Sequence, residues 1–260
     1  MAAGPMVKRI LILGGTTESR QLAAALAARP GLAVALSLAG RTESPAEQGV
    51  PTRSGGFGGA RGLARHLAEH EFDLLVDATH PYAARISANA AEAARLAGVP
   101  VLALRRPGWE KVTGDRWTLV DDVAGAVQAL GTASRHVFLS LGRQEIGAFA
   151  AAPQHHYLVR SVDPVEPPLA VPQAEYILAR GPFREADEHA LLREKGIDAL
   201  VSKDSGGAAT YGKIAAARAP GIEVGMIRRP ALPQVPSAAG VEELVAMVAH
   251  LSGPVAERGV

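Results

Sequence analysis

Short apolar runs alternate with alanine- and leucine-rich stretches of helical period along most of this 260-residue chain, and this alternation restricts the fold more than any other feature. The apolar runs have the length of strands, and the stretches between them are long enough to cross back over a sheet. A strand-then-helix order predicts an α/β fold, in which mainly parallel sheets are flanked by helices on both faces. The expected strands cover residues 9–13, 33–38, 74–77, 101–104, 137–141, 176–179, 199–202 and 223–227. The expected helices cover residues 18–29, 61–70, 82–97, 121–130, 185–195, 210–218 and 241–250.

The alternation is interrupted twice. Residues 105–118 have mixed polarity and no sustained period, so they are expected to connect two α/β units. A length of 260 residues suits two modest domains, and we predict one domain over 1–120 and a second over 121–260. The second interruption, residues 153–172, contains five prolines. Because proline disrupts helices and central strands, this segment is expected to be an ordered loop over a cleft or a flexible lid.

The clearest motif is the glycine turn at residues 14–19, where the first expected strand meets the first helix. Glycines allow a tight turn and a close ligand approach, and a helix N-terminus favours a diphosphate. The motif departs from G-x-G-x-x-G because Thr16 and Ser19 stand where two glycines belong, so their hydroxyls would have to bind phosphate instead. Nucleotide binding is the favoured interpretation, and a plain turn with a capping hydroxyl is the alternative.

Two further features of the first half bear on a nucleotide. Arg41 follows the second expected strand, where an NAD site normally has an acidic side chain. Because a guanidinium can pair with a 2′-phosphate, we expect NADP(H) rather than NAD(H), unless Arg41 is an ordinary solvated arginine. Residues 54–59 form a second glycine cluster ahead of a helix, where a cofactor could pass close to Gly56; a flexible loop is the alternative.

Polar residues follow the expected strand 74–77 in the order Asp77, Ala78, Thr79, His80, Pro81, Tyr82. Open α/β sheets bind ligands at the carboxyl ends of their strands. His80 and Tyr82 are therefore candidates to face a reacting centre, whereas Asp77 and Thr79 could serve only as helix caps.

In the second half, residues 202–207 place Lys203 and Ser205 between small residues, after a strand and before a helix. A lysine in that setting suits an anionic group, although solvent-facing loops of this composition are common. Other cations stand near strand ends and would form one basic wall if those ends shared a cleft. They are Arg143, Arg160, Arg180, Arg228 and Arg229, and Lys213 lies in the helix expected after residues 202–207.

Composition excludes several functions. A formal charge of +1 produces no global field toward nucleic acid or a membrane surface, and the absence of cysteine excludes disulfides and thiolate metal sites. His66 and His70 have a metal-ligand spacing, but no third ligand accompanies them, so no metal is expected. No apolar run reaches the length of a signal core or a membrane span, and we therefore expect a cytoplasmic protein.

Together these motifs resemble the precorrin-6A reductase family of cobalamin biosynthesis. The specific parts are the Asp-Ala-Thr-His-Pro-Tyr-Ala stretch at residues 77–83 and the Lys-Asp-Ser-Gly loop at residues 203–206. The resemblance spans about residues 8–251 and also includes residues 13–19, 55–59, 180–183 and 229–230.

The resemblance implies two Rossmann-like domains with the active site between them, and NADPH-dependent reduction of one double bond of precorrin-6A to give precorrin-6B. It implies that the substrate is a large ring bearing many carboxylates. Other cobalamin-pathway enzymes are the remaining partner class it indicates. Another NADP-dependent oxidoreductase of a smaller metabolite, or a non-catalytic NADP-sensing module, are the alternatives.

On this basis the candidate residues divide into three roles, and Lys203 takes two of them. The cofactor-binding candidates are Gly14, Gly15, Thr16, Thr17, Ser19, Arg41, Gly56 and Thr79. The catalytic candidates are His80, Tyr82 and Lys203. The substrate-binding candidates are Arg143, Arg160, Lys203, Ser205, Lys213 and Arg229.

Overall fold

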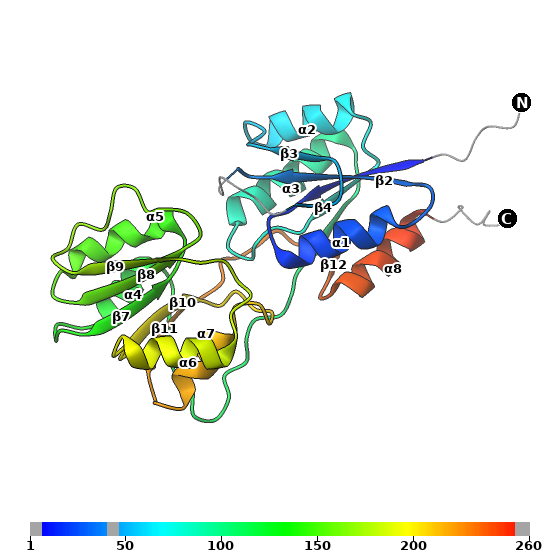
Figure 1. Ribbon diagram of the computed structural model, residues 1–260. Helices are drawn as coiled ribbons and strands as arrows, with labels where there is room; N and C mark the ends of the chain where they lie inside the picture. The colour runs from blue at the N-terminus through cyan, green and yellow to red at the C-terminus, as the bar shows by residue number, and fades with distance from the viewer. Residues whose placement is uncertain (1–6, 41–46, 253–260) are drawn as a thin grey trace, which may run out of the picture. The chain divides into compact units, whose positions relative to one another are not determined.

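The computed structural model describes residues 7–40 and 47–252, and it divides the chain into two compact units (Figure 1). Unit 1 comprises the chain up to Arg106 and again from Pro230 onward, and unit 2 comprises Pro107–Arg229. Each unit contains one six-stranded sheet in which every strand pair is parallel. The prediction of an α/β fold with two parallel sheets flanked by helices is therefore confirmed.

The sheet of unit 1 has the strand order β12-β5-β4-β1-β2-β3. Its strands are β1 (Lys8–Leu13), β2 (Leu32–Leu38), β3 (Thr52–Ser54), β4 (Leu74–Asp77), β5 (Val101–Leu104) and β12 (Ser237–Ala238). Its helices are α1 (Thr17–Ala27), α2 (Ala60–Glu69), α3 (Ala84–Ala97) and α8 (Val241–Ser252).

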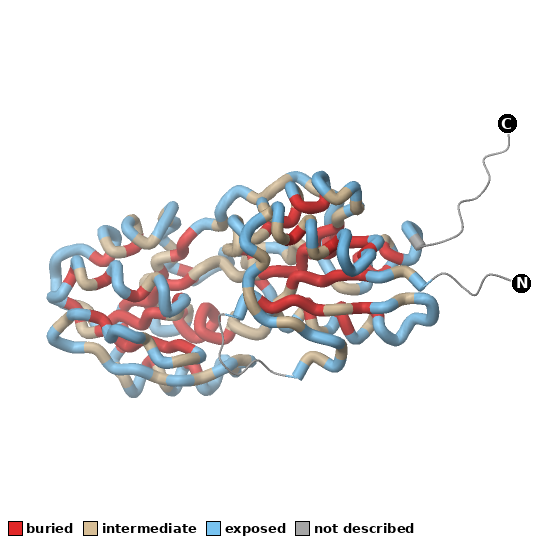
Figure 2. Tube along the Cα trace, turned by 90° about the horizontal axis from the view of Figure 1, so that it is seen from above, coloured by how far each residue is buried: buried red, intermediate tan, exposed pale blue. Residues whose placement is uncertain are grey.

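Helices cover both faces of this sheet, which explains why its central strands are continuously apolar. Ile10 and Ile12 of β1 join a core cluster with residues of α1 and α8. Leu11 and Leu13, which point to the opposite face, join a second cluster with residues of α2 and α3. The tube in Figure 2 shows buried segments running through the sheets, with exposed helix surfaces outside them.

The sheet of unit 2 has the order β6-β11-β10-β7-β8-β9. Its strands are β6 (Arg116–Val120), β7 (His136–Ser140), β8 (His156–Ser161), β9 (Ala174–Leu178), β10 (Ala199–Lys203) and β11 (Glu223–Ile227). Its helices are α4 (Val123–Ala129), α5 (Arg143–Ile146), α6 (Glu185–Glu194) and α7 (Gly212–Arg218), together with the 3-10 helix η1 (Gly147–Ala151).

Each sheet has a point at which the order of strand connections reverses. In unit 1 the chain runs outward through β1, β2 and β3 and then returns to β4 on the other side of β1. In unit 2 the reversal lies between β7 and β10. Ligands of open α/β sheets bind beyond the carboxyl ends of the strands at such points. The reversals bring the glycine turn beside the segment after β4, and residues 141–145 beside the segment after β10.

The structure divides the chain differently from the predicted domains 1–120 and 121–260. Residues 116–120 form β6, which pairs with β11 and so belongs to unit 2. Ser237 and Ala238 of β12 pair with β5, so the end of the described chain belongs to unit 1. Long-range strand pairing decides both assignments, and local composition does not reveal it.

Residues 153–172 were predicted to contain no central strand, and this prediction was wrong for the first part of the segment. β8 lies between β7 and β9 in the sheet, and its residues Tyr157 to Ser161 are buried. Four of the five prolines follow β8, so they are confined to the connection that leads to β9.

None of the helices in the described part of the chain has the length and apolar character needed to span a membrane.

Candidate functional site

The glycine turn of unit 1 is held by hydrogen bonds among its own residues. The Ser19 hydroxyl accepts from the backbone N–H groups of Gly15 and Thr16 at 3.1 and 3.0 Å, and it donates to the Thr16 carbonyl at 2.8 Å. The Thr16 hydroxyl accepts from the Ser19 N–H at 3.0 Å, which forms a capping box at the start of α1. Ser19 is fully buried. These two hydroxyls, expected to bind phosphate, therefore shape the turn in this structure.

Glycines give the turn its close packing and its backbone shape, and Thr17 is exposed at its end. A Cβ atom on Gly14 would lie 2.8 Å from both Leu36 Cδ1 and Ser19 Oγ, so only glycine fits there. Gly15 has a φ of +120°, a region that side chains rarely adopt. Thr17 is exposed and is the first residue of α1, where the helix dipole favours an anion.

A cavity of about 550 Å³ lies beside this turn, entirely within unit 1. Gly14 and Ser37 line it at the ends of β1 and β2, and Thr79 lines it after β4. The glycine cluster of residues 55–59, which includes the candidate Gly56, forms a second wall. A Cβ at Gly56 would meet no atom within 4 Å, so this wall faces open space. The structure thus places the ends of the predicted strands 9–13, 33–38 and 74–77, together with the glycine cluster, around one cavity.

Arg53 and Phe57 build the glycine wall. The sequence interpretation included Phe57 only as a member of the glycine cluster and did not include Arg53. The Arg53 guanidinium donates to Ser37 Oγ at 2.8 Å and to the carbonyls of Gly55 and Gly56 at 2.9 and 3.2 Å. It also lies 3.9 Å from the centre of the Phe57 ring, within cation–π range. Arg41, the expected 2′-phosphate ligand, lies outside the described residues.

Asp77 ends β4 in a buried ion pair. Arg105 donates to one carboxylate oxygen at 2.6 Å, and the Thr79 hydroxyl donates to the other at 2.6 Å. Burial by itself would raise the pKa of Asp77, but the Arg105 charge and the hydrogen bonds to the carboxylate hold that pKa below its usual value. Asp77 therefore remains ionised and anchors the loop, with the Thr79 side chain turned toward it.

His80 and Tyr82 follow on the same loop, and both are partly exposed. The Tyr82 N–H donates to His80 Nδ1 at 3.3 Å, and the two rings lie 5.6 Å apart. This bond makes Nδ1 an acceptor, so neutral His80 carries its proton on Nε2. The pair sits at the carboxyl end of β4, as predicted, and the structure adds its internal orientation.

In unit 2, Lys203 emerges at the end of β10 and forms an ion pair with Glu145 of α5. The second carboxylate oxygen of Glu145 accepts from the Gly142 N–H at 3.0 Å. Arg143 is exposed at the start of the same helix. Glu145 was not among the predicted residues, because its partner lies far away in sequence. The pair stands where the strand order of this sheet reverses.

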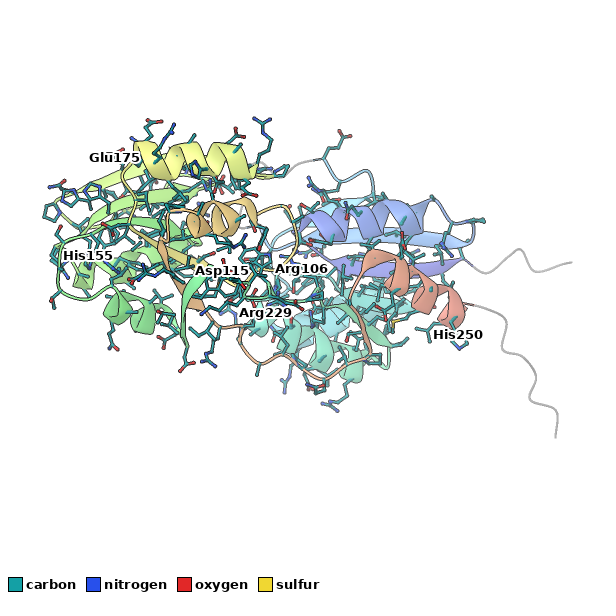
Figure 3. The ribbon with its side chains drawn as sticks, turned by 90° about the horizontal axis from the view of Figure 1, so that it is seen from below. Arg106, Asp115, His155, Glu175, Arg229 and His250 are labelled. Atoms are coloured by element: carbon teal, nitrogen blue, oxygen red, sulfur yellow. The ribbon has the colours of Figure 1, made fainter. Side chains whose placement is uncertain are left out.

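The loop after Lys203 is tied to the segment that begins unit 2. Asp204 accepts from the Trp109 N–H at 2.8 Å and pairs with Arg229 at 3.6 Å. Arg229, labelled in Figure 3, also donates to the carbonyl of Asp204 at 2.8 Å. The Ser205 N–H donates to the Lys203 carbonyl at 2.8 Å, which closes a tight turn. The carboxyl ends of the inner strands β10 and β11 thus bring together Lys203, Ser205 and Arg229.

Two predicted substrate ligands lie elsewhere. Arg160 is buried, forms two hydrogen bonds of 2.5 and 2.8 Å with Glu188, and lies over the Phe183 ring at 3.7 Å. Lys213 is buried in α7, where its ammonium nitrogen donates to the Thr210 carbonyl at 2.9 Å and lies 5.0 Å from the Trp109 ring. Neither side chain joins an exposed basic wall, because each is enclosed by the core of unit 2.

No group of three or more metal-ligating His, Asp or Glu side chains occurs among the described residues. Two parallel sheets, each with candidate side chains at its point of strand reversal, define a two-domain Rossmann-like α/β protein.

Comparison with known proteins makes the assignment specific. The family model "Precorrin-6x reductase CbiJ/CobK" matches residues 9–249, and the chain belongs to this family. A precorrin-6A reductase from Sinorhizobium sp is 58% identical over 246 residues, which is 95% of this chain and 94% of the relative. Another from Rhodococcus erythropolis is 49% identical over 242 residues, or 93% and 96% of the two chains.

A solved structure of CobK precorrin-6A reductase is also similar to this chain. It is 45% identical, superposes with a TM-score of 0.90, and the match covers 97% of this chain and all of that one. The expected family is therefore confirmed, and the family's reductase chemistry implies a nicotinamide cofactor.

Proposed function

We propose that this protein reduces a carbon–carbon double bond of precorrin-6A to give precorrin-6B in cobalamin biosynthesis, with NADPH as the reductant. Family membership supports the reaction. The structural observation that supports it best is the glycine turn at the strand reversal of unit 1, where Gly14 has no room for a side chain and opens onto a cavity. This cradle suits the diphosphate and adenosine of a dinucleotide.

Unit 1 binds the cofactor in this proposal. The exposed Thr17 and the start of α1 take the diphosphate, while Thr16 and Ser19 keep the turn in shape. Gly56 and Thr79 line the cavity for the adenosine, and Arg41 pairs with the 2′-phosphate. NADPH, when bound, supplies the hydride for the reduction.

Unit 2 binds the substrate carboxylates. Lys203, Ser205, Arg143 and Arg229 stand at the carboxyl ends of β7, β10 and β11 or directly after them. Cations at that edge suit a ring with many carboxylates. Arg160 and Lys213 support this edge from inside the unit, because the structure encloses both of them.

Reduction also adds one proton to the ring system for each hydride delivered. His80 and Tyr82 are the titratable side chains of the loop after β4, and we propose that they orient the ring edge and donate hydrogen bonds there. The hydrogen bond from the Tyr82 backbone to Nδ1 orients the His80 ring for this role.

A single assay tests the reaction. Purified protein is mixed with NADPH and precorrin-6A, and both the NADPH absorbance and the tetrapyrrole spectrum are followed. We expect the two signals to change together, in equal molar amounts. Binding of NADPH without turnover would instead support a sensing module. Oxidation of NADPH when a smaller metabolite replaces precorrin-6A, with no oxidation by precorrin-6A itself, would support a different oxidoreductase.

The cofactor assignment has its own test. Arg41→Ala should weaken NADPH binding by about 1–3 kcal/mol, the scale of a lost charge-assisted hydrogen bond, and leave NADH binding nearly unchanged. Equal losses for both cofactors would show that Arg41 does not recognise the 2′-phosphate.

A further inference from the structure

We infer that Arg85 is a cofactor-binding residue that pairs with a phosphate of the dinucleotide. This inference rests on the proposed function, because it assumes that the cavity of unit 1 receives the cofactor. Arg85 lies in the first turn of α3 and lines the same cavity as Gly14 and Thr79. Neither the sequence motifs nor the resemblance to the family indicated this residue.

The composition of the cavity singles Arg85 out. Leu13, Phe57, Leu63 and Ile86 supply apolar surface that suits a flat base. Among the described residues that line the cavity, Arg85 is the one that carries a charge. A phosphorylated ligand in this space therefore has one described side chain with which it can form an ion pair.

Three other described arginines of unit 1 near the carboxyl ends of the strands are already engaged. Arg53 holds the glycine wall, Arg105 pairs with Asp77, and Arg106 pairs with Glu18 at 2.5 Å. By contrast, within residues 7–40 and 47–252 no carboxylate forms an ion pair with Arg85, and its side chain is exposed. The Arg85 guanidinium can therefore bind an incoming anion without breaking an existing pair.

The position of Arg85 on α3 supports the same conclusion. A cation in the first turn of a helix is opposed by the helix dipole, and the first turn of α3 contains no acidic residue to offset it. Arg95, at the other end of the same helix, is in the favourable last turn and pairs with Glu92 at 2.7 Å. An anion bound between Arg85 and the turn at Gly14 would offset the unfavourable charge.

The two phosphate sources on the cofactor are the diphosphate and the 2′-phosphate, and paired titrations distinguish them. We would measure NADPH and NADH binding by calorimetry for the unaltered protein, Arg85→Ala and Arg85→Lys, with Arg95→Ala as the matched control. Arg85→Ala should raise the NADPH dissociation constant about tenfold or more, Arg85→Lys should restore part of the loss, and Arg95→Ala should change it less than about twofold.

If Arg85→Ala weakens NADPH and NADH equally, Arg85 binds the diphosphate; if it weakens NADPH alone, Arg85 binds the 2′-phosphate. Added salt should weaken NADPH binding more in the unaltered protein than in Arg85→Ala, because the variant has lost a charge pair. An NADPH dissociation constant unchanged in Arg85→Ala would overturn the inference and leave the proposed function intact. Failure of the unaltered protein to bind either nucleotide would overturn the cofactor site itself.

Discussion

Lys213→Met should remove a pH dependence from the stability of unit 2. Burial lowers the pKa of Lys213 from 10.5 to about 7, nearby Arg160 adds to the lowering, and Glu188 opposes it. Between these two values the unfolded lysine holds a proton that the folded lysine releases. The unfolded state therefore binds more protons, and the stability of the unaltered protein rises with pH across this interval.

The size of the effect follows from one titrating group. One pKa unit of difference between the folded and unfolded states corresponds to about 1.4 kcal/mol. The low pKa of folded Lys213 therefore lowers the free energy of unfolding, and this loss is largest at and below pH 7. Raising the pH from 7 to 9 should stabilise the unaltered protein relative to Lys213→Met by about 2 kcal/mol, since the folded group is half protonated at the start of the interval. Loss of the bond to Thr210 lowers the stability of the variant at both pH values and cancels in this comparison.

The assay uses a property of this chain, whose two tryptophans, Trp109 and Trp117, both belong to unit 2. Urea unfolding followed by tryptophan fluorescence therefore reports on that unit. Lys195→Met is the control, because Lys195 is partly exposed and its hydrogen bond to Glu175 raises its pKa, so it does not titrate between pH 7 and 9. If the stability difference between Lys213→Met and the unaltered protein is the same at both pH values, Lys213 is charged in the folded state and the reasoning is refuted.

Three further substitutions test other contacts. Gly14→Ala places a Cβ 2.8 Å from Ser19 Oγ and should destabilise unit 1 by about 1–3 kcal/mol and weaken NADPH binding; calorimetric binding equal to that of the unaltered protein would contradict this. Arg105→Ala leaves the buried Asp77 carboxylate without its cation and should cost about 3–5 kcal/mol in thermal unfolding, whereas the exposed Arg95→Ala should cost less than about 1 kcal/mol. Lys203→Ala should raise the KM for the macrocycle and leave the NADPH dissociation constant unchanged, and loss of cofactor affinity alone would assign the loop after β10 to the other ligand.

Much of the fold could be predicted from local patterns. The run Ile10 to Leu13 is buried on both faces of the sheet, and a strand covered by helices on both sides must be apolar throughout. The predicted strand at 199–202 was confirmed for the same reason. β3 and β12, with three and two residues, are too short to leave a periodic signal.

Most candidate residues could be placed correctly at the carboxyl ends of the strands, but their interaction partners could not be predicted. The sequence contains a serine at position 19, yet only the folded turn shows that its hydroxyl binds the amides of Gly15 and Thr16. Arg160 was expected to meet a substrate carboxylate, but the structure pairs it with Glu188, 28 residues away. Side chains distant in sequence meet only after the sheet has assembled.

The sequence by itself determined most of the strands and helices, the glycine turn and the family, because these depend on hydrophobic period, backbone freedom and local motifs. The tertiary structure decided the domain boundaries, the cavity beside Gly14 and which cations are buried. These depend on which strands pair and which side chains desolvate one another, and long-range packing sets both.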